Sequence, residues 1–393
     1  MKTICLIFWL FFLLFSCSPN RSSKKDIGEL KKTNDIELKK LDSIRINYLG
    51  NPTIHDLDSK SGLVIFMDHK ESSEQIIIAE FGGKILSSFS KFGDIPDGYG
   101  RLMSTLRVID ANSFIVYGYN GFMTYNKEGK ALSRVKLIDL QTPNYVPMLM
   151  GYGMEKIREK YLYINQSSPV NNDYSDINMY KDMYLLNLLN HAQGEKEPII
   201  QFPESSIFRN GKYFFRNAWD PVFHLADNKI YVAFGLEPTI YAFDDSAPYK
   251  LDFSLPLDLP DYNYFKGSDE YSDDFSFFGL RFTSGMILNV KKFNGYFLVA
   301  YFLGYDDLDT KTNLENKSSE EATMFRERMK EKYPSRIAIV DSMGIVLNDF
   351  VPQGLEPSSM LIRNGELWML EKPDEEIELD FFRLFRMGLK IEN

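Results

Sequence analysis

The chain has 393 residues, 44% of them hydrophobic and 15% aromatic, so it is long enough to bury a large core. Its formal net charge is −10 and its basic residues are not clustered outside the N-terminal segment, which argues against nucleic acid as a partner. With only Cys5 and Cys17, both near the N-terminus, the rest of the chain has no disulfide, cysteine nucleophile or cysteine metal site.

The first 17 residues have the pattern of a bacterial lipoprotein signal. Lys2 precedes an unbroken apolar run over residues 4–15, and the small Ser16 stands directly before Cys17. The run is shorter than the roughly 20 residues of a membrane span, and an uncleaved N-terminal anchor is the alternative. We therefore expect a signal peptide over residues 1–16, lipidation of Cys17, and attachment to the bacterial outer membrane, facing the periplasm or the cell surface.

Residues 17–40 mix basic with acidic side chains and have almost no apolar pattern. This composition predicts a flexible tether, whose basic residues either contact anionic head groups or belong to a plain solvated linker. The globular region is then expected over residues 41–393.

A repeating unit of four strands is clearest over residues 105–138. Runs rich in β-branched and aromatic residues cover 106–110, 113–117, 121–125 and 131–137, separated by turns containing Asn, Asp or Gly. Such residues tolerate the positive φ angles of tight turns, so the pattern predicts a four-stranded antiparallel meander.

The same pattern recurs along the chain, with copies beginning near residues 53, 222 and 285 and a weaker copy between residues 160 and 202. A sixth copy, over residues 358–389, lacks one strand, and residues 41–49 supply a candidate. A strand from the N-terminus would close the ring and remove its exposed edges. We therefore predict an all-β fold, a six-bladed β-propeller of four-stranded antiparallel blades closed by an N-terminal strand. Two separate β-sandwiches are the alternative.

Several segments resemble those of TolB-like six-bladed β-propeller lipoproteins of Bacteroidetes-type bacteria. They are the signal over residues 14–17, the turn and strand over 126–132 with its variant over 81–86, and the strand pair 230–234 and 240–244. The resemblance implies the propeller fold and carries over no catalytic residue.

Long connections are expected on one face of this ring. In a four-stranded blade, the turns after strands one and three emerge on one face, and the connections after strands two and four emerge on the other. The long connections all belong to the second set: 90–104, 165–181, 203–221, 256–284 and 303–335. Binding usually resides on long loops held by a rigid scaffold, so we expect the site on that face.

Two of these loops have a distinct character. Residues 256–284 interleave eight aromatic residues with six carboxylates, which suits a sugar, peptide or protein surface, or else pins the loop onto its blade. Residues 303–335 contain a capping box at residues 318–321, followed by Phe325, Met329 and Tyr333 at helical spacing. We expect one short helical insertion in blade five, either a lid over the channel or a packed decoration.

The sequence has no nucleophile elbow, zinc-protease or phosphate-loop motif, and we expect no catalytic residue, cofactor or metal site. His55 and His224 fall on inner strands of opposing blades, and the channel could bring them together, although satisfied core histidines are commoner. Polar and aromatic residues before the inner strands and in the long loops are the candidate ligand contacts: Tyr99, Arg101, Arg216, Trp219, Asp220, Tyr264, Phe265 and Arg281.

Two classes of function follow. The first is a lipid-anchored binding or interaction module for a glycan, a peptide or a partner protein of the envelope. The second is a propeller hydrolase or lyase that acts on a glycan through paired carboxylates at the channel mouth.

Overall fold

The computed structural model describes residues 36–50, 52–70, 73–136, 148–165, 173–315, 317–373 and 379–391. The predicted signal peptide, the lipidated Cys17 and most of the predicted tether lie outside these residues. Within the described ranges, no helix combines the length and the apolar character that a bilayer-crossing helix needs.

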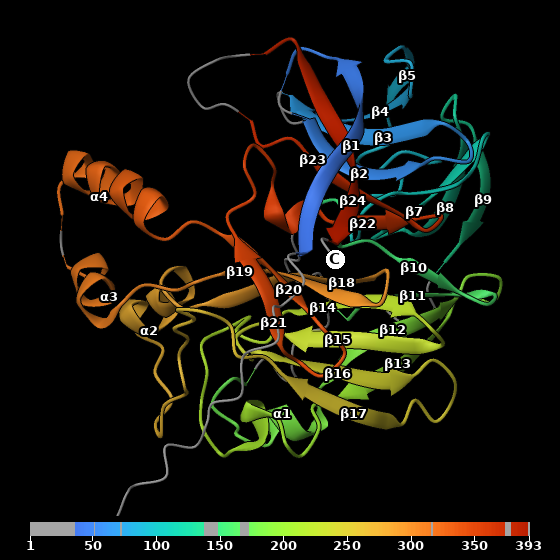
Figure 1. Cartoon of the computed structure of the whole chain (residues 1–393). Coiled ribbons are helices and arrows are strands. Elements are labelled where there is room, and N and C mark those ends of the chain that lie inside the picture. The colour runs from blue at the N-terminus through green and yellow to red at the C-terminus, as the bar shows by residue number, and fades with distance from the viewer. Residues whose placement is uncertain are drawn as a thin grey trace, which may run out of the picture. The chain divides into compact units, whose positions relative to one another are not determined.

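The described chain forms six four-stranded antiparallel sheets arranged in a ring, which confirms the predicted six-bladed β-propeller (Figure 1). The strands of blades one to three are β2 Pro52–Asp58, β3 Leu63–Lys70, β4 Ser73–Glu80, β5 Ile85–Ser90, β6 Arg107–Asp110, β7 Ser113–Gly118, β8 Gly121–Asn126, β9 Ala131–Val135, β10 Glu155–Ile157, β11 Lys160–Ile164, β12 Tyr184–Asn190 and β13 Glu195–Gln201. Those of blades four to six are β14 Pro221–Ala226, β15 Lys229–Phe234, β16 Thr239–Asp244, β17 Leu251–Pro256, β18 Met286–Phe293, β19 Tyr296–Phe302, β20 Arg336–Val340, β21 Val346–Phe350, β22 Leu361–Arg363, β23 Glu366–Leu370, β24 Phe381–Ile391 and β1 Ile36–Asn47.

Burial within a blade follows the order of its strands. The first strands of neighbouring blades contact one another, as β14 contacts β18, so they stand around the axis of the ring. The second strand is covered on both faces by adjacent blades, and five of the six residues of β15 are buried. The fourth strand is an outer edge, and no residue of β9 is fully buried. This is why central strands read as continuous apolar runs and outer strands do not.

Strand β1 closes the ring as predicted, by pairing antiparallel with β24 from Ile36 opposite Ile391 to Asn47 opposite Phe381. It begins at Ile36 rather than at residue 41, so residues 36–40 are strand and not tether. Ile36 is 1% exposed, and its carbonyl accepts a hydrogen bond from Nδ2 of Asn348 in blade five. The charged side chains of Lys39 and Lys40 conceal this start in the sequence, because they leave few apolar residues to show the alternation.

Blade three contains a first strand that the sequence pattern did not reveal, β10, which has only three residues and begins with Glu-Lys.

Blade two matches its prediction closely, and Gly121 shows why the turns are so regular. Its φ is 109°, and an added Cβ would lie 2.2 Å from the carbonyl oxygen of Val135. Only glycine fits at this position, where the turn between β7 and β8 approaches the backbone of β9.

The helices lie in the long connections: α1 Met179–Asp182, α2 Phe275–Gly279, α3 Asp307–Asn313 and α4 Ser319–Lys332, with 3₁₀ turns at Ile207–Arg209, Leu280–Phe282 and Pro357–Ser359. Helix α4 confirms the predicted insertion, since Ser318 and Glu321 form a capping box and Phe325 and Met329 are buried. The insertion also holds α3, which was not predicted. In Figure 1, α2, α3 and α4 all lie on the left of the sheets, where the long connections emerge.

Candidate functional site

An ionisable side chain from the first strand of every blade lies near the axis of the ring. These side chains are Asp56 of β2, Arg107 of β6, Glu155 of β10, His224 of β14, Lys291 of β18 and Arg363 of β22. Asp56, His224 and Lys291 are at most 5% exposed. The channel is therefore filled with ionisable groups that interact across blades.

Two ion pairs join neighbouring blades in this network. Nη2 of Arg363 lies 3.1 Å from Oδ2 of Asp56, and Nη1 of Arg107 lies 3.2 Å from Oε2 of Glu155. Burial raises the pKa of Asp56, although the charges of Arg363 and Arg107 oppose the shift. Burial alone would also raise the pKa of Glu155, but the surrounding positive charges lower it, Arg107 first. Each carboxylate thus interacts with both guanidinium groups.

Lys291 and His224 occupy the other half of the channel. Nζ of Lys291 donates to the carbonyl oxygens of Gly151 at 3.1 Å and Phe223 at 3.3 Å, and burial lowers its pKa to about 8. Burial, helped by the charge of Lys291, lowers the pKa of His224 to about 4. His224 is therefore neutral at physiological pH.

The two inner-strand histidines have different surroundings. Nδ1 of His55 accepts a hydrogen bond from the backbone N–H of Leu106, which ties blade one to blade two. The charges that act on His224 come instead from Lys291, Glu155 and Asp227. In the described part of the chain, no group of three His, Cys, Asp or Glu side chains is arranged to hold a metal ion.

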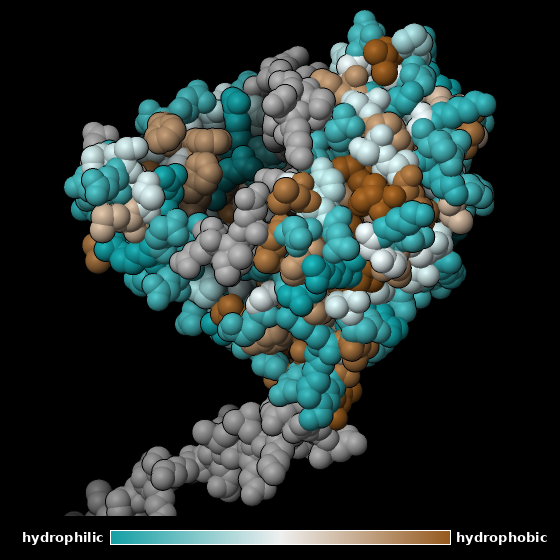
Figure 2. All heavy atoms as spheres, turned by 90° about the horizontal axis from the view of Figure 1, so that it is seen from above, coloured by the Kyte–Doolittle hydropathy of each residue, from teal (hydrophilic) through white to brown (hydrophobic). Residues whose placement is uncertain are grey.

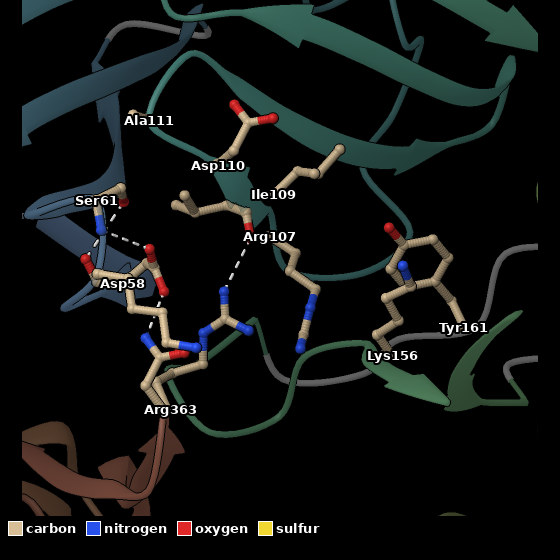
Figure 3. Close-up of a pocket in the computed structure, with 12 residues that line it drawn as sticks. Asp58, Ser61, Arg107, Ile109, Asp110, Ala111, Lys156, Tyr161 and Arg363 are labelled. Carbon is tan, nitrogen blue, oxygen red and sulfur yellow. Dashed lines mark hydrogen bonds between the residues drawn. The ribbon is translucent and has the colours of Figure 1, made fainter. Parts of the chain in front are cut away.

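A pocket of about 420 Å³ opens at the end of the channel where the tight turns lie, a surface that we call the turn face (Figure 3). It is lined by the ends of β2, β6, β10 and β22 and by the turns that follow β2, β6 and β22. Four cationic side chains surround it: Lys60, Arg107, Lys156 and Arg363. Sequence analysis missed this site, because each blade contributes only one or two polar residues to it. The available signal was a single arginine at the end of each of two short strands, Arg107 at the start of β6 and Arg363 at the end of β22.

The opposite surface, from which the long connections emerge, is called the loop face here. The predicted contact residues on it differ in how far their side chains are exposed. Tyr99 is fully buried, and its hydroxyl donates to Oε2 of Glu74 at 2.7 Å. Trp219 is 8% exposed and packs edge-on against Tyr180 and Phe208. Both side chains therefore belong mainly to the core beneath the loops.

Tyr264 and Phe265 are partly buried and pin their loop. The ring of Phe265 lies 5.7 Å from that of Phe277 and 6.1 Å from that of Phe214. The ring of Tyr264 lies under Nζ of Lys266, at 3.2 Å. Arg101 is exposed in the connection between blades one and two. The anchoring interpretation of this aromatic loop therefore describes Phe265 better than the binding interpretation does.

The remaining predicted residues, Arg216, Asp220 and Arg281, lie in the connections just before β14 and β18. Together with Trp219 and two tyrosines that were not among the predicted contacts, Tyr174 and Tyr271, they form what we call the loop-face cluster. The exposed guanidinium of Arg216 stacks over the ring of Tyr174 at 4.2 Å. Burial and Asp273 raise the pKa of Tyr271, and the charge of Arg216 opposes this shift. Tyr174 in turn stacks on Trp219 at 6.4 Å.

Asp220 gives the loop-face cluster its electrostatic character. Burial raises its pKa to about 7, although Nδ2 of Asn217 donates to it at 2.9 Å and the charge of Arg281 opposes the shift. A carboxyl group that titrates near neutrality beside an arginine is more common at functional sites than elsewhere.

Large exposed apolar side chains also project from the helices of the loop face. Phe275 is 83% exposed, Leu308 72%, Met324 67% and Phe282 59%. Figure 2 shows that hydrophobic residues on the face in view are interspersed with a largely hydrophilic surface.

The fold is similar to solved structures of low sequence identity. A member of the DUF4221 family from Bacteroides vulgatus has a TM-score of 0.62 at 11% identity, over 92% of this chain and all of that one. A Bacteroides fragilis protein thought to be exported has a TM-score of 0.46 at 10% identity, over 92% and 97% of the two chains. A gluconolactonase from Xanthomonas campestris has a TM-score of 0.37 at 8% identity, over 91% of each. No family model matches the sequence, and neither does any curated protein. The first similarity shows the fold alone.

Proposed function

We propose that the protein is a non-enzymatic binding module of the bacterial envelope, which holds a glycan, a peptide or a partner protein on its loop face. The proposal rests on the exposed guanidinium of Arg216, which stacks over Tyr174 in the same cluster as Asp220 and Arg281. The last two residues interact electrostatically. An arginine stacked on an aromatic ring offers both a flat apolar surface and a set of hydrogen-bond donors to a ligand.

The arrangement of the chain supports this proposal. Arg216 and Asp220 come from the connection before β14, Arg281 comes from the connection before β18, and Tyr174 comes from the connection within blade three. Three separate connections thus converge on one patch, while buried Trp219 and partly buried Phe265 anchor two of them to the core. Rigid anchoring of this kind lowers the entropy cost of binding.

The location is part of the same proposal. The signal pattern ending at Cys17 supports export and lipid attachment, in the manner of the TolB-like lipoproteins that the sequence resembles.

Loop-face variants test the binding proposal against a matched surface control. The parent protein is screened on arrays of bacterial glycans and peptides, and the Kd of its best ligand is then measured by calorimetry. We expect Arg216→Ala and Tyr174→Ala each to weaken that ligand by about tenfold, since hot-spot aromatic and arginine residues cost more than about 1 kcal/mol. The control, Arg158→Ala, removes an exposed arginine that hydrogen-bonds Asp245 on the turn face. Equal affinity in all four proteins would refute the proposal.

One observation favours the alternative of a glycan hydrolase or lyase. A carboxyl group with a pKa of about 7, such as that of Asp220, is suited to general acid catalysis. If this function is correct, Asp220→Asn abolishes release of reducing ends from a polysaccharide substrate, whereas a binding module shows no turnover before or after the substitution.

A further inference from the structure

The turn-face pocket has features that the loop-face function does not use. It is formed by blades one, two, three and six, its volume of about 420 Å³ falls in the range of small-molecule sites, and two arginines stand in its wall. Both arginines are largely buried, with side-chain exposures of 13% for Arg107 and 11% for Arg363.

Each arginine is held in place through only part of its guanidinium group. Arg363 donates through Nε to the carbonyl oxygen of Leu57 at 3.1 Å and through Nη2 to that of Val108 at 2.9 Å, and Nη2 also faces Asp56. Arg107 donates through Nη1 to the carbonyl oxygen of Met154 and to Glu155. These bonds fix the orientation of both groups before any ligand arrives.

The donors that remain point to an anionic ligand. A guanidinium group has five N–H donors, so Arg363 keeps the two on Nη1, and Arg107 keeps those on Nε and Nη2, without a bond to the described protein. Guanidinium donors of this kind match the paired oxygens of a carboxylate, sulfate or phosphate group. Lys60 and Lys156 add two ammonium groups to the pocket.

The two acidic residues in the pocket wall are already engaged. Oδ2 of Asp58 accepts from the backbone N–H of Ser61, and its Oδ1 accepts from Nδ2 of Asn364. Asp110 caps its own turn by accepting from the backbone N–H of Asn112, and Figure 3 shows its carboxylate directed away from Arg107 and Arg363. Neither carboxylate therefore occupies the spare donors of the arginines.

We propose that the turn-face pocket binds a small molecule of about monosaccharide size that carries a carboxylate, sulfate or phosphate group. The anionic group bonds the free edges of Arg107 and Arg363, and Lys60 and Lys156 close over it from the rim. The walls formed by Val108, Ile109 and Tyr161 contact the rest of the molecule. This site is separate from the loop-face cluster and does not depend on its function.

Calorimetry with four probes of one skeleton tests the chemistry of the ligand. Glucuronate, glucose 6-sulfate, glucose 6-phosphate and neutral glucose are titrated into the parent protein at low ionic strength. We expect at least one acidic probe to bind with a Kd below about 1 mM, and glucose not to bind in that range. The strongest of the three acidic probes identifies which oxyanion the site prefers. Equal binding of glucose, or no binding of any acidic probe, would overturn the proposal.

Variants then locate the site. Lys60→Ala combined with Lys156→Ala removes two exposed rim charges and should weaken the best acidic probe about tenfold, whereas Arg158→Ala, on the same face but outside the pocket, leaves it unchanged. Arg107→Lys retains a positive charge beside Glu155 but loses the Nε and Nη2 donors of the guanidinium group. It should therefore weaken binding of the probe by more than about tenfold. Equal losses in the Arg158 and lysine variants would assign the effect to general surface charge and refute the pocket. Arg216→Ala, on the loop face, is expected to bind the probe like the parent.

Discussion

Closure of the ring by β1 makes a sharp prediction about two residues of the same strand. Ile46 is 0% exposed, whereas Leu41 is 59% exposed. Ile46 packs in a cluster with Ile54 and Phe66 of blade one and Trp368 of blade six. It therefore joins the last blade to the first, and Ile46→Ala should weaken that joint while Leu41→Ala should not.

The size of the effect follows from burial. Replacing a fully buried isoleucine with alanine costs about 2–5 kcal/mol, through lost transfer free energy and the cavity left behind. An exposed apolar residue away from special features changes stability by less than about 0.5 kcal/mol. Since the total free energy of unfolding is roughly 5–15 kcal/mol, Ile46→Ala removes a substantial part of it.

Urea unfolding followed by circular dichroism and tryptophan fluorescence measures both variants. Trp368 is 3% exposed and lies in the same cluster, so its emission reports on the joint between blades six and one. We expect the unfolding midpoint of Ile46→Ala to fall well below that of the parent, and that of Leu41→Ala to stay near it. A cost for Ile46→Ala no larger than that for Leu41→Ala would mean that β1 does not hold the ring closed.

Three further predictions concern protonation and attachment. The pKa of His224 is lowered to about 4 in the folded protein, so the unfolded chain binds a proton first as the pH falls below about 6.5, and stability falls between pH 6.5 and 4. His224→Gln should remove about 2 kcal/mol of this acid-induced loss, measured by urea unfolding at pH 7 and pH 4.5. The pKa of Asp220 is raised to about 7, so its contribution to stability is present at low pH and is lost as the pH rises to 7. The variant Asp220→Asn does not undergo this loss, so its free energy of unfolding relative to that of the parent should be higher at pH 8 than at pH 5. Cys17→Ser should abolish incorporation of a labelled fatty acid and membrane retention, and unchanged labelling would refute the lipoprotein assignment.

Much of the fold could be predicted from the sequence because the signals are local. The turns of blade two are rich in Asn, Asp and Gly, with Gly121 and Gly129 at positive φ, and the apolar runs between them have the length of strands. The short first strand of blade three left no such signal, because Glu155 and Lys156 occupy two of its three positions. Its place in the sheet is set by pairing with β11, which is a tertiary property.

The candidate site was harder to predict, because burial decides which residues reach a ligand. Tyr99, Trp219 and Phe265 have the composition of binding residues, yet they pack into the core or against other rings. Arg216 stays exposed, and its guanidinium lies over the ring of Tyr174, which comes from a connection more than forty residues earlier. The turn-face pocket was missed for the same reason, since Arg107 and Arg363 meet only when the last blade lies beside the first two.

The charges along the axis need an explanation beyond stability. Removing carboxylates and guanidinium groups from water costs free energy that their mutual attraction often fails to recover, and apolar side chains of similar size would pack six first strands equally well. Stability alone therefore does not account for Asp56, Glu155, Arg107 and Arg363. Their arrangement does have a geometric result, because each carboxylate holds one edge of a guanidinium group and leaves another edge directed into a cavity. Orientation of donors toward a cavity is what a binding site requires, and an apolar channel would not provide it.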